Sequence, residues 1–275
     1  MNKDKTILKT LLLGSFFASL SAMLGGSTFV FTRYVVDSID PYTLSFLRYG
    51  LTGLILFLLS ISVYMNKKFA KADLIPMCFL GLAMITLFPN FMALGLEHTT
   101  AARAGLLYAT MPLCTIIIAY FFNIEKITFN KSLAVLLVIL GVSFCMSERV
   151  DNNFQDTLKG DFLMMIGVLS ASCFTVFSGK YLKKYGNIPV MIFLILIGTI
   201  LNLIISIIFG NSIISLLEIN KFEAAALLML IIPGGVVMMY CWGKALQLIS
   251  PTQAAISLGF NPLSAILLGS IILNE

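Results

Sequence analysis

The sequence predicts an all-α polytopic membrane protein, and three observations support that fold class. Of its 275 residues, 59% are hydrophobic and only 11% are charged, whereas a soluble domain uses roughly 45–50% apolar and about 25% charged residues. Long apolar runs alternate with short polar loops, and a segment near the middle of the chain returns near its end. The runs lack the alternation of a β-barrel, so helices are the expected way to pair the backbone in lipid.

The apolar runs are long enough to cross a bilayer, since a helix needs about 20 residues to span roughly 30 Å of hydrocarbon. The first run is too long for the apolar region of a cleaved signal peptide, so we interpret it as a span. We predict nine transmembrane helices, at 11–32, 42–64, 74–96, 99–122, 130–147, 160–180, 188–209, 222–247 and 251–273.

The repeated segment predicts two related halves. PLCTIIIAYFFNIE starts at Pro112 and PLSAILLGSIILNE starts at Pro262, an offset of 150 residues. The first ends the fourth predicted span and the second ends the ninth, so the two cross the membrane in opposite directions. We therefore predict an inverted repeat of five-helix units, 1–147 and 160–275, joined by the polar loop 148–159. A tenth helix is missing after the second copy. We expect truncation of a ten-helix protein, with natural loss as the alternative.

The basic residues predict the orientation. Most of the Lys and Arg residues, including Lys67, Lys68 and Lys131, fall in loops on the side that holds the N-terminus. The positive-inside rule places that side in the cytoplasm, so we expect a multi-pass protein of the cytoplasmic membrane. The same short loops account for the net charge of +5, and nucleic acid is not an expected partner. The expected partners are the lipid bilayer, a small-molecule solute and a second copy of the chain as a homodimer.

Two stretches carry a family resemblance. TTAARAGLLYATMPLCTIIIAYFFNIE (99–125) and SPTQAAISLGFNPLSAILLGSIILNE (250–275) resemble the EamA signature of the drug/metabolite transporter superfamily, with Ile124 and Asn274 in place of the usual glycine. GGSTFVFTRYVVDSIDPYTLSFLRYGLTG (25–53) resembles the opening of that family. The resemblance implies a transporter of two inverted five-helix halves. It leaves the substrate open among amino acids, other metabolites, nucleotide sugars and drugs.

Prolines inside the spans indicate where the helices bend. Pro112 and Pro262 fall near the middles of the fourth and ninth spans, and Pro89 and Pro233 lie within the third and eighth. A proline removes one backbone hydrogen bond and disturbs the carbonyl four residues earlier. We interpret all four as helix kinks. The carbonyls that they free would either bond to neighbouring groups or face a ligand at the interface of the repeats.

Polar and aromatic residues at depth are candidates for substrate binding, since intramembrane polar groups are functional hypotheses. Trp242 could instead belong to an interfacial aromatic belt, and Thr28 could serve helix packing. Arg48 could dock a carboxylate, or be anchored at the interface by Asp37 and Asp40. The candidate substrate-binding residues are Thr28, Arg48, Asn90, Tyr108, Tyr240, Trp242 and Asn261.

Other chemistry has little support in the sequence. The five cysteines lack the paired spacing of a zinc site or disulfide framework, so we expect no metal and no cofactor. There is no HExxH or GxSxG motif and no mid-span carboxylate, so we expect neither an enzyme nor a proton antiporter that relies on a buried carboxylate. We expect a secondary transporter that exports amino acids or related solutes by alternating access. The alternatives are a nucleotide-sugar or lipid-linked carrier and a non-transporting membrane scaffold.

Overall fold

The computed structural model describes residues 2–146, 154–210 and 219–273, and the elements in these ranges are all helical. The first half contains α1 (Asn2–Val35), α2 (Pro41–Met65), α3 (Lys71–Gly81), η1 (Leu82–Leu87), α4 (Phe88–Leu96), α5 (Ala101–Tyr108), α6 (Met111–Phe121) and α7 (Phe129–Met146). The second contains α8 (Phe154–Tyr185), α9 (Asn187–Phe209), α10 (Lys221–Ile231), η3 (Ile232–Val237), α11 (Met238–Leu248), α12 (Pro251–Ile256), η4 (Ser257–Phe260) and α13 (Asn261–Ile272).

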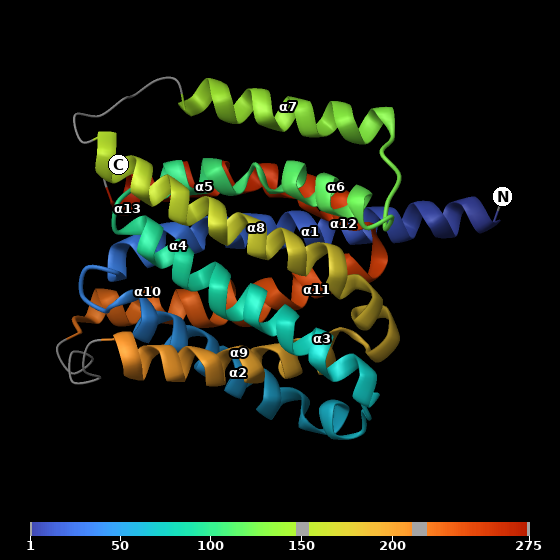
Figure 1. Ribbon diagram of the computed structural model, residues 1–275, viewed down its shortest axis with the longest axis horizontal. Coiled ribbons are helices and arrows are strands. Elements are labelled where there is room, and N and C mark those ends of the chain that lie inside the picture. The colour runs from blue at the N-terminus through green and yellow to red at the C-terminus, as the bar shows by residue number, and fades with distance from the viewer. Residues whose placement is uncertain (1, 147–153, 211–218, 274–275) are drawn as a thin grey trace.

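The helices form a bundle with roughly parallel axes (Figure 1). In the described part of the chain, eight are long and apolar enough to cross a membrane. They are Ile7–Val35, Pro41–Met65, Lys71–Leu96, Ala101–Phe121, Thr157–Tyr185, Asn187–Phe209, Lys221–Leu248 and Pro251–Ile272. The remaining predicted span, 130–147, corresponds to α7 at the edge of the bundle, and its crossing of the membrane stays a prediction.

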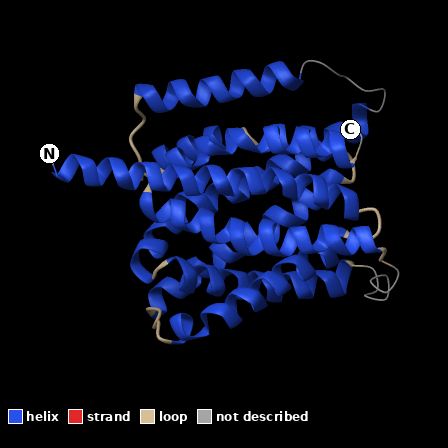
Figure 2. Ribbon diagram, turned by 180° about the vertical axis from the view of Figure 1, so that it is seen from behind, coloured by secondary structure: helices blue, strands red, loops and turns tan. Residues whose placement is uncertain are grey.

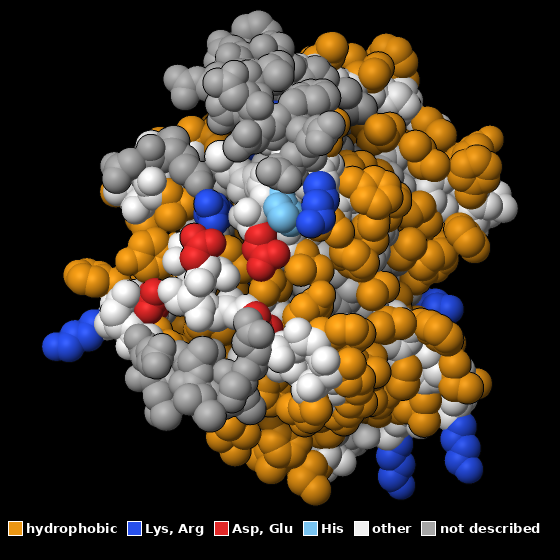
Figure 3. All heavy atoms as spheres, turned by 60° about the vertical axis from the view of Figure 1, so that its left-hand side comes forward, with side chains coloured by type: hydrophobic (Ala, Val, Ile, Leu, Met, Phe, Trp, Pro, Cys, Tyr) orange, Lys and Arg blue, Asp and Glu red, His pale blue; other side chains and the backbone are white. Residues whose placement is uncertain are grey.

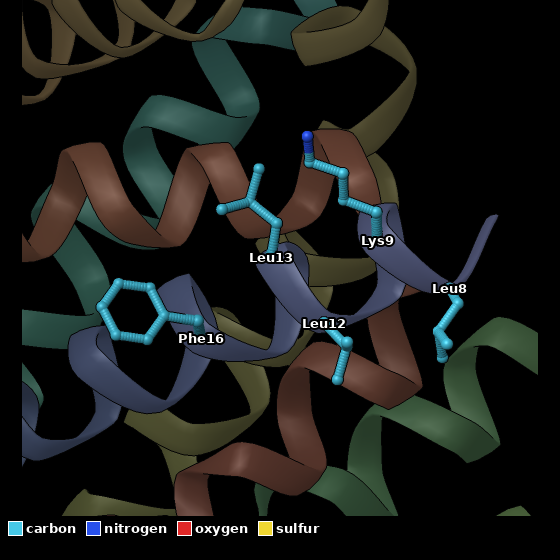
Figure 4. Close-up of a pocket in the computed structure, with 5 residues that line it drawn as sticks. All are labelled: Leu8, Lys9, Leu12, Leu13 and Phe16. Carbon is cyan, nitrogen blue, oxygen red and sulfur yellow. The ribbon is translucent and has the colours of Figure 1, made fainter. Parts of the chain in front are cut away.

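The apolar surface of the bundle is extensive, as expected where lipid replaces water. Large exposed hydrophobic side chains lie on most of the long helices, from Phe16 on α1 to Ile271 on α13. The N-terminal part of α1 projects beyond the other helices (Figure 2). A shallow hollow on this segment is lined by Leu8, Lys9, Leu12, Leu13 and Phe16 (Figure 4). Its apolar side chains lie on one exposed helix, so we assign it to the lipid-facing surface.

Two of the long helices change to a π-helical turn at equivalent points. The π-helix η1 interrupts the helix from Lys71 to Leu96, and η3, 150 residues later, interrupts the helix from Lys221 to Leu248. A proline accompanies each: Pro89 lies two residues after η1, where its ring disturbs the carbonyl of Ile85, and Pro233 lies within η3. The wider turn leaves carbonyl groups free to accept other hydrogen bonds.

The next helix of each half is also broken. Helix α5 ends at Tyr108 and α6 starts at Met111, while α12 ends at Ile256 and the 3₁₀ turn η4 leads to α13 at Asn261. Pro112 and Pro262 lie in the first turn after these breaks, where the missing N–H leaves no intrahelical bond unmade. In Figure 1, α5 continues into α6 from left to right and α12 into α13 from right to left, so the two broken helices run in opposite directions.

Helix α8 occupies the second part of the stretch 148–159 that was expected to form a polar loop. Residues 147–153 lie outside the described ranges, but α8 already begins at Phe154 and continues through Lys159. A helix can extend past the bilayer because its backbone hydrogen bonds are internal, so the polar composition of this stretch does not end it. Glu275, the counterpart of Glu125 in the repeat, lies outside the described residues.

Candidate functional site

A narrow cavity lies at the centre of the bundle, where the broken helices meet α1. The cavity is small, with a volume of ≈ 20 Å³, which is about enough for one water molecule. Helices α1, α4, α5, α11 and α13 and the turns η1 and η4 each contribute to its wall. The lining residues are Ser21, Gly25, Thr28, Phe29, Met84, Phe88, Tyr108, Met238, Met239, Trp242, Leu258 and Asn261.

Asn261 is the first residue of α13, directly before the proline that follows the break. Its side chain is 0% exposed, and neither its Oδ1 nor its Nδ2 has a hydrogen-bond partner. An unpaired buried amide costs about 1–3 kcal/mol per group, so such an arrangement is rare in folded proteins. Gly25 on α1 faces this amide, and a Cβ there would be 3.4 Å from Oδ1 and 3.5 Å from Nδ2.

Aromatic rings form another part of the cavity wall. The Tyr108 ring lies with its centroid 5.5 Å from that of Phe29 and 5.1 Å from that of Phe88. Trp242 also lines the cavity and is 4% exposed, and its Nε1 has no hydrogen-bond acceptor. Burial at the centre of the bundle is not the location of an interfacial aromatic belt, which was the alternative for Trp242.

The hydroxyl groups of Thr28 and Ser21 in the cavity already have partners. Thr28 Oγ1 donates to the Gly25 carbonyl at 2.7 Å, and Ser21 Oγ donates to the Met238 carbonyl at 3.0 Å. Ser21 was not among the residues singled out from the sequence. Nothing there distinguishes a serine that faces the cavity from one that packs between helices.

Arg48 lies behind the cavity wall and does not line it. It is 2% exposed, and one of its terminal nitrogens donates to the Gly234 carbonyl at 2.9 Å, while its guanidinium lies 5.1 Å from the Tyr49 ring centroid. The expected anchoring of Arg48 by Asp37 and Asp40 is therefore wrong. The reason is the π-helix η3, whose carbonyl is available to the arginine inside the bundle. Asp37 instead pairs with Arg33 at 3.3 Å.

Asn90 and Tyr240 also lie outside the cavity lining. Asn90 Nδ2 donates to the Thr86 carbonyl at 2.7 Å and to Asn202 Oδ1 at 2.8 Å, which joins the π-helical region to α9. Tyr240 is 37% exposed, and its ring centroid lies 6.3 Å from that of Phe17. Of the seven candidates, the structure brings Thr28, Tyr108, Trp242 and Asn261 together around one space.

Charged side chains gather at one end of the bundle, surrounded by a hydrophobic surface (Figure 3). Arg103 makes a bidentate ion pair with Asp161, with N–O distances of 2.6 to 3.1 Å. Partial burial raises the pKa of the nearby Glu97 carboxyl above its usual value. Within the described ranges, no group of three His, Cys, Asp or Glu side chains is placed to hold a metal ion.

The arrangement of two similar broken-helix units around a central cavity has a counterpart among known proteins. The model of the EamA-like transporter family matches residues 12–147 and again residues 158–275. The chain belongs to the EamA-like transporter family. Its match covers both halves of the bundle, so the family assignment applies to the whole fold.

Relatives of this EamA-like chain are named as transporters. One protein of Archaeoglobus fulgidus, named an uncharacterized transporter, is 26% identical over 262 residues, which are 94% of this chain and 88% of the relative. The transporter YoaV of Bacillus subtilis is 24% identical over 259 residues, 92% of this chain and 86% of its own length. Another A. fulgidus transporter is 25% identical over 182 residues, and the match spans only 63% of that relative.

A solved structure shares the fold. A protein whose title reads "Crystal structure of protein" superposes with a TM-score of 0.74 at 17% identity, over 97% of this chain and 89% of its own. At that identity the likeness concerns the fold alone. Family and relatives together indicate a multi-pass membrane transporter.

Proposed function

We propose that this EamA-like protein exports small metabolites, amino acids or related solutes, by alternating access around the central cavity. The observation that carries the proposal is the pair of unpaired polar groups, the Asn261 amide and Trp242 Nε1, in a closed space between oppositely directed broken helices. A solute that bonds to these groups would replace water without leaving buried groups unsatisfied.

The chain is proposed to work as an inverted repeat of five-helix units with nine transmembrane helices in this sequence, five in 1–147 and four in 160–275. The π-helices and the breaks before Met111 and Asn261 lie 150 residues apart in the two halves, which supports a common ancestral unit. In inverted-repeat transporters, substrate binds between the repeats, which then rock against each other. The breaks are the points where each long helix can bend with the least loss of backbone hydrogen bonding.

Contacts at the two ends of the bundle would close the pathway in turn. At one end Arg103 pairs with Asp161. At the other, Glu125 pairs with Lys131 and also accepts a hydrogen bond from the backbone N–H of Thr252 at 3.0 Å, which joins the two halves. The lysine-rich loops support a cytoplasmic N-terminus, with the Glu125 contact on that side.

The cavity chemistry argues against the alternative substrates. A nucleotide sugar or lipid-linked carrier would need basic side chains in the cavity for the phosphates, and no Lys or Arg lines it. A membrane scaffold would have no use for unpaired polar groups in a closed cavity, since they lower stability.

Flux in proteoliposomes tests the proposal. The purified chain is expected to catalyse saturable counterflow of at least one radiolabelled amino acid, nucleobase or related solute, and Asn261→Leu is expected to abolish it. Met111→Leu changes the equivalent residue of the other half, which does not line the cavity, and is expected to transport at the normal rate. The absence of saturable flux for every solute would refute the proposed function. If Asn261→Leu transports as fast as the unmodified chain, the cavity is not the transport site.

A further inference from the structure

The charge of the cavity restricts what can bind in it. Its lining contains no Lys, Arg, His, Asp or Glu side chain. An ionised carboxylate or ammonium that enters such a space loses its hydration and finds no opposite charge, which is strongly unfavourable. Arg48, a buried cation, does not line the cavity; it donates one hydrogen bond to the Gly234 carbonyl, and its Nε has no partner. A ligand with no net or separated charge therefore suits this cavity better than a zwitterion.

The hydrogen-bonding groups restrict the ligand further. A primary amide presents an acceptor and a donor side by side, and both atoms of the Asn261 amide are unpaired. Its complement is an edge with an adjacent donor and acceptor, as in the cyclic amide or amidine of a heterocycle, and asparagine binds nucleobase edges in this way. Trp242 Nε1 adds a donor, which requires a further acceptor on the ligand.

The remaining polar groups argue against a sugar. Thr28 and Ser21 use their hydroxyl protons on the carbonyls of Gly25 and Met238. A sugar presents many hydroxyls on all sides and would need several free partners around it. Here the remaining polar groups of the lining are the Asn261 amide, the Trp242 indole N–H and the Tyr108 hydroxyl, and the rest of the wall is mostly aromatic rings, methionines and one leucine.

The shape of the wall favours a flat ligand. Phe29, Phe88 and Tyr108 pack against one another on one part of it. The Trp242 ring is buried among apolar side chains and forms no aromatic pair in the described part of the chain, so a flat ligand that displaced the flexible methionines could stack on it. The absence of a side chain at Gly25 leaves the space in front of the Asn261 amide open. The three methionines of the lining can move aside to admit a ring, because their side chains are unbranched and flexible.

We propose that the central cavity binds an uncharged planar heterocycle, of the nucleobase type, whose adjacent donor and acceptor pair with the Asn261 amide. The inference rests on the proposed function, since it names the substrate class of the same cavity. It narrows the expected solutes from amino acids to neutral ring compounds of similar size.

The fluorescence of Trp242 can report ligand binding in the cavity. Trp242 is the one tryptophan among the 275 residues, and it lines the cavity. Uracil and hypoxanthine, added to the full chain in lipid nanodiscs, are expected to quench its fluorescence saturably. Uracil methylated on both ring nitrogens keeps the flat ring but loses the N–H donors, and it is expected to bind at least about tenfold more weakly. Phenylalanine, a zwitterion with a flat ring, serves as the charged comparison.

Three variants connect the binding to Asn261. Asn261→Leu is expected to weaken uracil binding at least about tenfold, because the ligand edge would then be buried without partners. Gly25→Ala keeps the amide but adds a methyl group 3.4 Å from it, an ordinary contact distance that the fold tolerates, and it is expected to weaken binding as well. Met111→Leu, at the equivalent position of the first half and outside the cavity lining, is expected to bind like the unmodified chain.

The outcomes separate the two proposals. Tighter binding of phenylalanine than of uracil, or uracil binding that is unchanged in both Asn261→Leu and Gly25→Ala, would overturn the inference about the ligand. Saturable amino-acid flux without any heterocycle binding would also overturn it and leave the proposed function standing. Heterocycle binding through Asn261 without flux of any solute would support the ligand class and refute transport by this chain.

Discussion

The two helix breaks are equivalent in position but differ in chemistry. At the break between α5 and α6, Thr110 donates its hydroxyl proton to the Leu107 carbonyl at 2.7 Å, and the next residue is the apolar Met111. At the break between α12 and α13, the residue equivalent to Met111 is Asn261, whose side-chain amide is buried without a partner. One break is satisfied by its own residues, whereas the other carries an unpaired group into the cavity.

The helices that pack on these two breaks also differ in the residues that they present. Helix α1 packs on α13 and presents Gly25 and Gly26, whereas α8 packs on α6 and presents Thr175 and Val176 at the equivalent positions. A Cβ at Gly26 would be 1.9 Å from Ser264 Oγ and 2.3 Å from the Asn261 carbonyl oxygen. The second break therefore has the closer backbone approach. The comparison teaches that two helix breaks at equivalent positions can share a backbone pattern while only one of them carries an unpaired amide.

The largest effect is expected where α1 touches the second break. Gly26→Ala should lower the melting temperature of the purified chain substantially, because the added methyl overlaps a backbone carbonyl that cannot rotate away. Overpacking of this kind costs about 1–3 kcal/mol and occasionally more. An unchanged melting temperature would mean that α1 and α13 are not in close contact, and the contrast between the two breaks would fail.

The next largest effect is expected at the π-helices. Asn202 Nδ2 donates to the Ile85 carbonyl at 2.8 Å, and its equivalent in the first half, Thr52, donates to the Ile231 carbonyl at 3.2 Å. Asn202→Leu should cost about 1–3 kcal/mol, because it removes this bond and also the bond from Asn90, which keeps only the Thr86 carbonyl. Thr52→Val removes a single, longer hydrogen bond and should cost less. The melting temperatures of the two variants rank their losses of stability. A larger loss in Thr52→Val than in Asn202→Leu would contradict this prediction.

A smaller difference is expected between the helix caps. Thr100 accepts from the Arg103 N–H at 3.2 Å and begins α5, while its equivalent Ser250 accepts from the Gln253 N–H at 3.4 Å and begins α12. Removal of a cap costs about 1 kcal/mol. Thr100→Ala should show this full loss. Ser250→Ala also removes a long bond from the Ser250 hydroxyl to Glu125 at 3.3 Å, but it should show less, because Glu125 still accepts from the Thr252 N–H at 3.0 Å. If Glu125→Ala in addition to Ser250→Ala causes no further loss, the backup role of Glu125 is wrong.

The smallest effect is expected at Gly269, which is equivalent to Ala119. A Cβ at Gly269 would meet no atom within 4 Å, so Gly269→Ala should stabilise the helix by about 0.5–1 kcal/mol through lower backbone entropy of the unfolded chain. This variant is the same chemical change as Gly26→Ala with the opposite expected sign. Comparison of the two melting temperatures distinguishes a close helix contact at Gly26 from a general effect of replacing glycine by alanine.

Much of the fold could be predicted from the sequence, but less of the site. The apolar runs and the repeated Pro-Leu segments predict the long helices and the positions of Pro112 and Pro262, because hydrophobic length and proline act locally on the backbone. Ser21, Met84 and Met238 could not be predicted as cavity residues, since an apolar or hydroxyl side chain in a span looks the same whether it faces lipid, another helix or a cavity. Arg48 was placed at the interface for a similar reason, because the available carbonyl of a π-helix leaves no simple mark in the sequence.

The sequence by itself determined that the chain inserts into lipid as helices, that its halves share one pattern and that each half bends at equivalent residues. These properties follow from hydropathy and from backbone chemistry along a single segment. The tertiary structure alone decided that Asn261 and Trp242 face one space while Asn90 and Tyr240 do not. The direction of a side chain is set by which helix packs against it, and the close approach of α1 at Gly25 and Gly26 leaves the Asn261 amide buried and unpaired.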